Sequence, residues 1–271
     1  MLFLGVDLAW GDSVPGRPGN ESGVVALDAS GEILDAGWTR GVEETLAWVA
    51  RVTDRQPDVL LLVDAPLLVE NLGGQRLCET QVGQRYGRWK VSANTTNVHS
   101  PRLAGVDLRK ELEGAGWAYD DGWDGPPQQG RRLSECYPYT TIVGVERLGY
   151  DEDRPRYKRK PRTMPIAEFR PARAAACDEL IARVAALHDA DPPLQLGSHP
   201  VTAVLADDAS PDADRAYKHR EDLLDAAICA WTASLWHRHG ADACQVLGPE
   251  RTEGTPTATI IAPCRPEQRC R

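Results

Sequence analysis

The chain of 271 residues lacks a long hydrophobic run and a basic N-terminus. A helix that crosses a bilayer needs about 18 or more consecutive apolar residues, and no such stretch occurs. The first apolar segment, Leu2 to Val6, is short and is followed at once by Asp7. A secretory signal would begin with basic residues ahead of a longer apolar segment. We therefore expect no transmembrane helix, no signal peptide and no membrane partner.

The sequence also lacks paired cysteines. It has seven cysteines, which is an odd number, and no two of them have the C-x-x-C spacing. Disulfide frameworks and zinc sites are usually marked by an even count or by such short spacings. We therefore expect reduced thiols and a cytoplasmic protein, with neither a disulfide framework nor a zinc site.

The sequence also has fewer basic residues than acidic ones. Asp and Glu number 40 against 31 Lys and Arg, which gives a formal net charge of −9. A protein that coats nucleic acid needs a broad basic surface, so the composition argues against that class. A nuclease is still compatible with this charge, because bound metal ions offset negative charge locally in an active site.

The N-terminal part of the chain contains a clear series of strand and helix patterns. Residues 2–7, 22–27 and 32–39 predict three strands in an antiparallel meander. Apolar residues at helical spacing predict a helix over 42–53. The unbroken apolar run 59–63 is typical of a parallel strand that is buried on both faces. This β-β-β-α-β order is typical of the ribonuclease H-like fold. We therefore predict an α/β protein with a mixed sheet of that type, flanked by helices.

The rest of the chain is predicted to add helices and short strands to this core. Residues 70–132 are poorly periodic and are interpreted as an inserted region of loops and helices. No internal repeat or clean boundary is visible, so we treat residues 1–271 as a single domain. The predicted elements are helices over 75–85, 103–114, 139–147, 166–188 and from Ser210-Pro211 to His239 with Gly240 as its stop, and strands ending near Glu135 and covering 244–247 and 258–262.

Carboxylates stand where the predicted strands end. Asp7 closes the first strand and Asp64 follows the run 59–63. If these strands are adjacent and parallel, both side chains lie at the carboxyl edge of the sheet, where ligands bind. Crowded carboxylates repel unless a cation or a proton neutralises them, and such clusters hold Mg²⁺ or Mn²⁺. The alternative for each residue is an acid that bonds only its own turn.

Further acids precede helical segments. Asp222 and Asp225 are three residues apart, so they share one face of a helix, beside small residues that allow close approach to a sheet. Asp225, directly before an apolar run, is expected to be less solvated than Asp222, and Glu221 is interpreted as a solvated surface acid. Glu135 stands just before a predicted helix, where an exposed acid is the alternative interpretation.

One dense basic run, residues 154–162, interrupts this acidic pattern. Its members Lys158, Arg159 and Lys160 are candidates for phosphate contacts, which an otherwise acidic protein would need in order to bind nucleic acid. A solvated loop is the alternative. His219 is a further candidate, as a general base or a phosphate contact, or else it is a simple surface residue.

Five short motifs occur in the order found in one known family. They resemble the family called domain of unknown function 429, whose members are predicted to be ribonuclease H-like nucleases, and the likeness covers nearly the whole chain. The acid spacing is also similar to that of Holliday-junction resolvases, which implies Asp7, Asp64, Asp222 and Asp225 as ligands and gives Glu135 no counterpart. The motifs are Gly5-Val6-Asp7-Leu8-Ala9-Trp10, Val63-Asp64-Ala65-Pro66-Leu67, Glu135-Cys136-Tyr137-Pro138, Lys158-Arg159-Lys160 and Asp222-Leu223-Leu224-Asp225-Ala226.

Together these features predict a metal-dependent nuclease. Its catalytic acids would be Asp7, Asp64, Glu135, Asp222 and Asp225, with Asp7, Asp64 and Asp225 as ligands of two Mg²⁺ or Mn²⁺ ions. The expected partner is nucleic acid, and the choice between DNA and RNA is open. The oligomeric state is also open, with a homodimer as one alternative.

Two other functions fit the same pattern. One is a nucleotide-binding enzyme of the actin and sugar-kinase architecture. In such an enzyme the strand-end aspartates would take part in binding ATP and Mg²⁺. The first turn lacks the phosphate loop, rich in Gly and Thr, that is usual in that class. The other is a non-catalytic ribonuclease H-like module that binds nucleic acid or protein.

Overall fold

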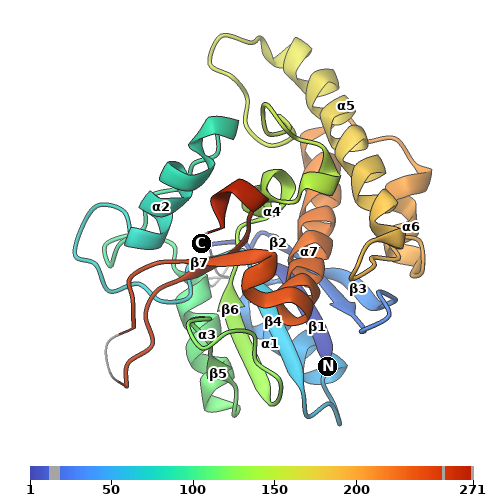
Figure 1. Ribbon diagram of the computed structural model, residues 1–271. Coiled ribbons are helices and arrows are strands. Elements are labelled where there is room, and N and C mark those ends of the chain that lie inside the picture. The colour runs from blue at the N-terminus through green and yellow to red at the C-terminus, as the bar shows by residue number, and fades with distance from the viewer. Residues whose placement is uncertain (12–18, 252–253, 270–271) are drawn as a thin grey trace.

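A mixed β-sheet forms the centre of the protein. The computed structural model describes residues 1–11, 19–251 and 254–269, and within these ranges six strands form the sheet in the order β3-β2-β1-β4-β6-β5 (Figure 1). β1, β2 and β3 are antiparallel neighbours, whereas β4 is parallel to β1, and β6 and β5 continue in that direction. The strands are β1 (Leu2–Asp7), β2 (Glu21–Leu27), β3 (Ile33–Arg40), β4 (Val59–Val63), β5 (Ala118–Tyr119) and β6 (Arg131–Glu135).

Helices cover both faces of this sheet. α1 and α3 pack on one face, and α7 lies along the other with α4, α5 and α6 packed against it (Figure 1). A separate antiparallel pair, β7 (Cys244–Leu247) and β8 (Ile260–Pro263), packs beside α4. The predicted α/β class, with a mixed sheet flanked by helices, is confirmed. The helices are α1 (Gly41–Val52), α2 (Leu77–Tyr86), α3 (Ala104–Gly114), α4 (Pro138–Gly144), α5 (Ile166–Ala185), α6 (Pro200–Asp207) and α7 (Asp214–His239).

The alternation of side chains along the strands divides the core into two halves. Leu4 and Val6 of β1 belong to the core beneath α1 and α3, whereas Phe3 belongs to the core beneath α7. The same alternation places Leu60 and Leu62 of β4 on the α7 side. Because side chains alternate between the two faces, any residue an even number of positions along the strand from Phe3 or Leu62 also faces α7.

Two glycines allow α7 to lie directly on the sheet. A Cβ on Gly5 of β1 would come within 2.1 Å of the carbonyl oxygen of Ala226. A Cβ on Gly23 of β2 would come within 1.9 Å of the carbonyl oxygen of Asp222. Both distances are shorter than any non-bonded contact, so no other residue fits there without displacing the helix. The backbones of β1, β2 and α7 are therefore in direct contact.

Three details differ from the sequence-based expectation. α7 begins at Asp214 and not at Ser210, because the Ser210 hydroxyl accepts a hydrogen bond from Arg220 Nε (2.9 Å) and does not cap a helix. α6 was not predicted, and the two-residue strand β5 lies in a segment predicted to be a loop. The other predicted helices and strands are present with ends shifted by a few residues.

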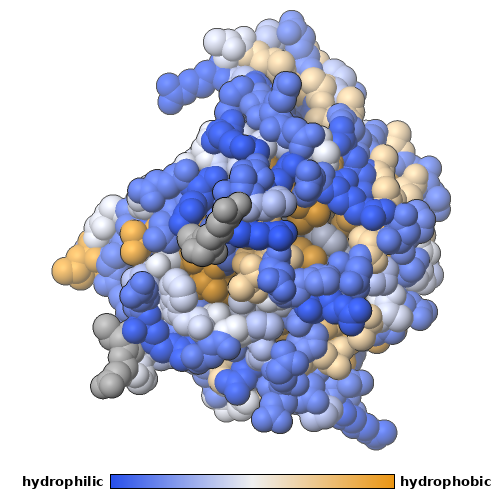
Figure 2. Space-filling view, viewed as in Figure 1, coloured by the Kyte–Doolittle hydropathy of each residue, from blue (hydrophilic) through white to orange (hydrophobic). Residues whose placement is uncertain are grey.

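The surface and the cysteines agree with the composition. Hydrophilic side chains cover most of the face shown in Figure 2. Six cysteines fall within the described ranges, and all of them are free thiols and buried. Among the helices that the structure describes, none combines the length and the apolar character needed to cross a membrane.

Candidate metal centre

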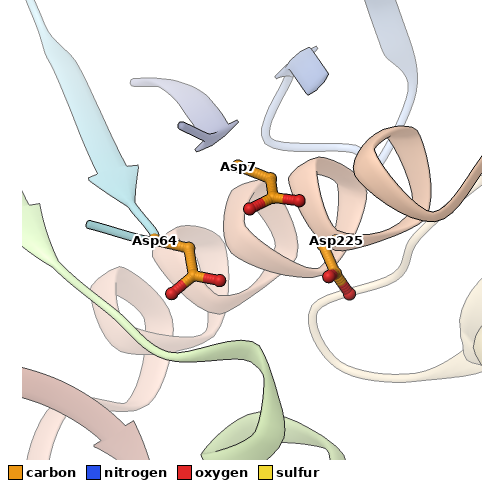
Figure 3. Close-up of side chains that lie close together, drawn as sticks. All are labelled: Asp7, Asp64 and Asp225. Carbon is orange, nitrogen blue, oxygen red and sulfur yellow. The ribbon is translucent and has the colours of Figure 1, made fainter. Parts of the chain in front are cut away.

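Three aspartates from distant parts of the sequence converge at one edge of the sheet. Asp7 is the last residue of β1, Asp64 directly follows β4, and Asp225 lies in the middle of α7. Their side chains lie close together in Figure 3, and one carboxylate oxygen from each lies within 4.8 Å of the others. Asp7 and Asp225 are buried, and Asp64 is half-buried. The structure thus brings together the three acids that the sequence suggested as metal ligands.

Strand direction and side-chain alternation explain this convergence. β1 and β4 are parallel, and the Asp64 amide donates to the carbonyl oxygen of Val6 (2.8 Å), so both strands end at the same edge. Asp7 lies on the same side of β1 as Phe3, and Asp64 lies on the same side as Leu62 of β4, so both carboxylates face α7. The close approach of α7 at Gly5 then brings Asp225 to the same place.

Two further acids lie one turn earlier on α7. Glu221 and Asp222 are only 6% and 2% exposed, and both line the cleft beside Asp7. The interpretation of Glu221 as a solvated acid was wrong, because α7 lies so close to β2 that this part of the helix is covered. The signal was present in the sequence: positions 218, 221, 222 and 225 follow the i, i+3, i+4, i+7 spacing of one helix face.

Two lysines place their ammonium groups among these acids. Lys158 contacts Asp225 Oδ2, and its Nζ lies 3.8 Å from Glu221 Oε1 and 4.0 Å from Asp64 Oδ2. Lys218 Nζ lies 2.5 Å from Asp222 Oδ1, 3.2 Å from Glu221 Oε1 and 4.0 Å from Asp7 Oδ2. Lys158, predicted to contact substrate, thus sits inside the acid cluster, and Lys218 was missed.

The charges in the cluster do not balance. Five carboxylates face two ammonium groups among the described side chains (Asp7, Asp64, Glu221, Asp222 and Asp225 against Lys158 and Lys218). Such an excess of buried negative charge favours either protonation or the binding of a cation.

The crowding of buried carboxylates shifts the pKa values of several groups in the cluster. Burial, and then the neighbouring Asp7, raise the pKa of Asp222 to about 9 against the opposing effect of Lys218. Burial raises the pKa of Asp225 to about 6 although Lys158 opposes the shift, and burial also raises the pKa of Asp64 well above its ordinary value. Burial alone would lower the pKa of Lys158, but Asp225 and other acids hold it well above its ordinary value.

The hydrogen bonds leave ligand atoms free. Tyr157, which is fully buried, donates its hydroxyl to Asp225 Oδ1 (2.8 Å) and so fixes the orientation of that carboxylate. Within the described residues, the buried atoms Asp7 Oδ2 and Asp222 Oδ2 have no hydrogen-bond donor. Buried polar atoms without a partner are costly, and a cation would satisfy them. A donor set made only of carboxylate oxygens suits Mg²⁺ or Mn²⁺.

Glu135 lies near this cluster, but its carboxylate is bound by other partners. Leu133 of β6 belongs to the core beneath α1 and α3, and Glu135, two residues later, points to that same side. Arg76 binds both of its carboxylate oxygens, and the Leu67 amide donates to Oε2 (3.1 Å). Its hydrogen-bonding capacity is therefore occupied by a structural network.

Of the remaining candidates, Arg159 lines the cleft beside the acids, whereas His219 and Lys160 do not. His219 Nδ1 is 2.8 Å from Glu21 Oε2, and its ring stacks on Trp38 with 3.6 Å between the centroids. Arg159 donates to the side chain of Asn94, and Lys160 Nζ donates to the carbonyl oxygen of Met164 (2.8 Å). None of the three contacts the three-aspartate group.

A cleft of about 260 Å³ opens above the acids. Its walls include Trp10, Tyr137 and Tyr139, together with Asn94 and Arg159. The cleft therefore combines a carboxylate floor with aromatic and cationic walls, an arrangement that can hold a divalent cation together with a flat or anionic ligand.

The structure is thus a mixed α/β protein with a carboxylate cluster at the ends of its central strands. The family model described as "Protein of unknown function (DUF429)" matches residues 5–253, and the chain belongs to this family. No curated protein and no solved structure matches the chain.

Proposed function

We propose that the protein is a ribonuclease H-like, metal-dependent nuclease. The strand order supports this assignment, because three antiparallel strands are followed by a helix and a fourth strand parallel to the first. The acids occupy the places that this architecture uses for metal ligands: the end of β1, the residue after β4 and the helix packed across them. Fold alone does not imply function, so the proposal depends on the acid cluster.

The observation that carries the proposal is the convergence of Asp7, Asp64 and Asp225, whose ligand oxygens lie within 4.8 Å of one another. Asp7 Oδ2 has no hydrogen-bond donor among the described residues, although it is buried. A purely structural cluster would satisfy such atoms with donors from the chain. We infer that Asp7, Asp64 and Asp225 hold Mg²⁺ or Mn²⁺, with Asp222 or Glu221 completing the coordination.

The chain's own residues prepare this site for phosphodiester hydrolysis. Bound divalent cations would supply an activated water and stabilise the leaving oxygen. Tyr157 keeps Asp225 oriented through its hydroxyl, and the peptide hydrogen bond between Asp64 and Val6 keeps the ends of β1 and β4 together. Lys158 places a permanent positive charge beside the centre, where it would attract the phosphate of the substrate.

Mutation of the first strand-end aspartate tests the proposal. Asp7→Asn should abolish Mg²⁺-dependent and Mn²⁺-dependent cleavage of single-stranded and junction oligonucleotides, and should weaken Mn²⁺ binding measured by calorimetry, with the fold intact by circular dichroism. Asp54→Asn is the matched control, because the Asp54 side chain is 75% exposed and lies outside the cleft. Wild-type cleavage by Asp7→Asn would refute the mechanism.

Two experimental results would favour the alternative functions over the nuclease. Saturable binding of ATP by the wild-type protein, without cleavage of any oligonucleotide, would favour the nucleotide-binding alternative. Oligonucleotide binding that is indifferent to Mn²⁺, again without cleavage, would favour a non-catalytic module.

A further inference from the structure

A second pocket, outside the acid cluster, is lined mainly by cations. Its volume is about 230 Å³, and its lining residues are Lys90, Asp153, Arg154, Arg156, Arg159, Lys160 and Pro161. All but Lys90 and Asp153 belong to the basic run 154–162 noted in the sequence. Five positively charged side chains therefore surround one small hollow in a protein whose net charge is −9.

The positive charge of this pocket is largely uncompensated. Among the described residues that line it, Asp153 is the one carboxylate, and it lies 2.6 Å from Lys90 Nζ and 3.9 Å from Arg156 Nη2. Arg154 donates Nε to the carbonyl oxygen of Lys90 (2.9 Å), and Lys160 also binds carbonyl oxygens. These bonds to neutral groups hold the side chains in place and leave their charges available to an anion.

The basic pocket adjoins the acidic cleft. Arg159 lines both, and the preceding residue, Lys158, extends into the acid cluster. Tyr139 lines the cleft, and the guanidinium of Arg154 lies 4.4 Å from the centre of its ring. A ligand with a single phosphate would need only the acidic cleft, whereas a ligand with phosphates at regular intervals could occupy both.

We infer that the basic pocket binds a backbone phosphate of the polynucleotide strand whose scissile phosphate lies at the candidate metal centre. This inference rests on the proposed nuclease function and narrows it, because the substrate is then an oligonucleotide and not a mononucleotide. Guanidinium and ammonium groups are the usual partners of backbone phosphates, and such contacts position a strand without reading its sequence. The chemistry recognised is the phosphodiester backbone, which DNA and RNA share.

Binding without cleavage tests the pocket independently of catalysis. Labelled single strands of increasing length are titrated in EDTA against wild type and against the double variant Arg156→Gln, Lys160→Gln. Each phosphate contact contributes about 0.7 to the slope of log affinity against log salt for single strands, so a variant that no longer binds the one phosphate in the pocket should lower that slope by about 0.7. Lys110→Gln with Arg238→Gln is the control, since it removes the same charge from exposed positions outside both pockets. An unchanged slope in the pocket variant, or an equal fall in the control, would overturn the inference.

A comparison of substrates separates this inference from the proposed function. With Mn²⁺, the pocket variant should lose cleavage of long oligonucleotides but retain hydrolysis of bis(p-nitrophenyl) phosphate, which has one phosphodiester. A reduced salt slope together with no hydrolysis by the wild type would uphold the pocket and refute the nuclease function. If inorganic phosphate or tripolyphosphate competes as well as a long strand, and affinity does not rise with strand length, the pocket is a small-anion site and the inference fails.

Discussion

The guanidinium of Arg76 binds both carboxylate oxygens of Glu135 far from solvent. Nη2 lies 2.6 Å from Oε1 and Nη1 lies 2.8 Å from Oε2, and each side chain is 4% exposed. Arg76 also binds Glu79 (2.9 Å) and the carbonyl oxygen of Leu68 (3.1 Å). This network joins the end of β6 to the start of α2 and to the segment that follows Asp64. Glu135 is therefore a positioning residue for the cleft.

The variant Glu135→Gln should destabilise the protein, because it leaves the buried Arg76 only partly compensated. We expect a loss of about 3 kcal/mol, near the lower end for a broken buried pair, since Glu79 still binds Arg76. The free energy of unfolding in urea measures this loss. The control is Glu267→Gln, which breaks the exposed pair with Arg88 and should cost no more than about 1 kcal/mol. A Glu135→Gln protein that is as stable as wild type but has lost Mn²⁺ binding would instead make Glu135 a ligand.

The metal-free protein should respond to pH through Asp222. Its pKa is raised to about 9 by burial and by Asp7, so the folded state keeps a proton that the unfolded chain releases near pH 4. Raising the pH from about 4 to about 9 therefore disfavours the folded state. In EDTA, Asp222→Asn should gain stability relative to wild type as the pH rises, whereas Asp54→Asn should not.

Addition of Mn²⁺ should reduce this pH dependence in the wild type, because a cation replaces the proton in neutralising the acids. Melting temperatures at several pH values, with EDTA and with Mn²⁺, provide the measurement. Parallel curves for wild type and Asp222→Asn in EDTA would contradict the prediction.

Loss of the Tyr157 hydroxyl should weaken the proposed Mn²⁺ binding without removing a candidate ligand. Tyr157→Phe deletes the hydrogen bond to Asp225 Oδ1, and loss of such an outer partner typically lowers metal affinity about 10-fold or more. Tyr150→Phe is the control, because the Tyr150 hydroxyl is buried and has no partner among the described residues. Calorimetric titration with Mn²⁺ compares the two, and equal affinities would show that Tyr157 does not orient Asp225.

A methyl group at Gly5 should force α7 away from the sheet. The added Cβ would lie 2.1 Å from the carbonyl oxygen of Ala226 and 2.2 Å from the amide nitrogen of Ala230. We expect Gly5→Ala to cost at least the ~1–3 kcal/mol of ordinary overpacking, and to weaken Mn²⁺ binding as Asp225 moves. Gly37→Ala is the control, because a Cβ there meets nothing within 4 Å. Denaturation and Mn²⁺ titration of both variants check the prediction, and similar stability for the two would argue against a tight contact.

The sequence pattern was sufficient to predict those strands and helix faces that depend on residues close together in the chain. The unbroken apolar run of β4 and the acid at its end were visible in the sequence, and the structure places Asp64 beside Asp7. The spacing of Asp222 and Asp225 also indicated one helix face. These inferences depend on periods of 2.0 and 3.6 residues, which the sequence displays directly.

Contacts between distant segments were not predictable in the same way. The face on which Glu135 lies depends on the register of β6 against β4, in which Val63 pairs with Glu135, and composition does not fix register. The basic run suggested phosphate contacts for Lys158, but only the path of the chain brings this lysine to Asp225. Glu221 is likewise buried beside a distant segment, since Lys158 Nζ lies 3.8 Å from its Oε1.

Lys158 and Lys218 affect whether the chain can fold before it binds a metal ion. An acid cluster that depended wholly on metal would leave a newly made chain unable to fold until the ion arrived. Here Lys158 and Lys218 supply part of the required positive charge from within the chain. Under the proposed metal binding, we expect folding and metal loading to be separate steps, with an incoming cation displacing an internal one.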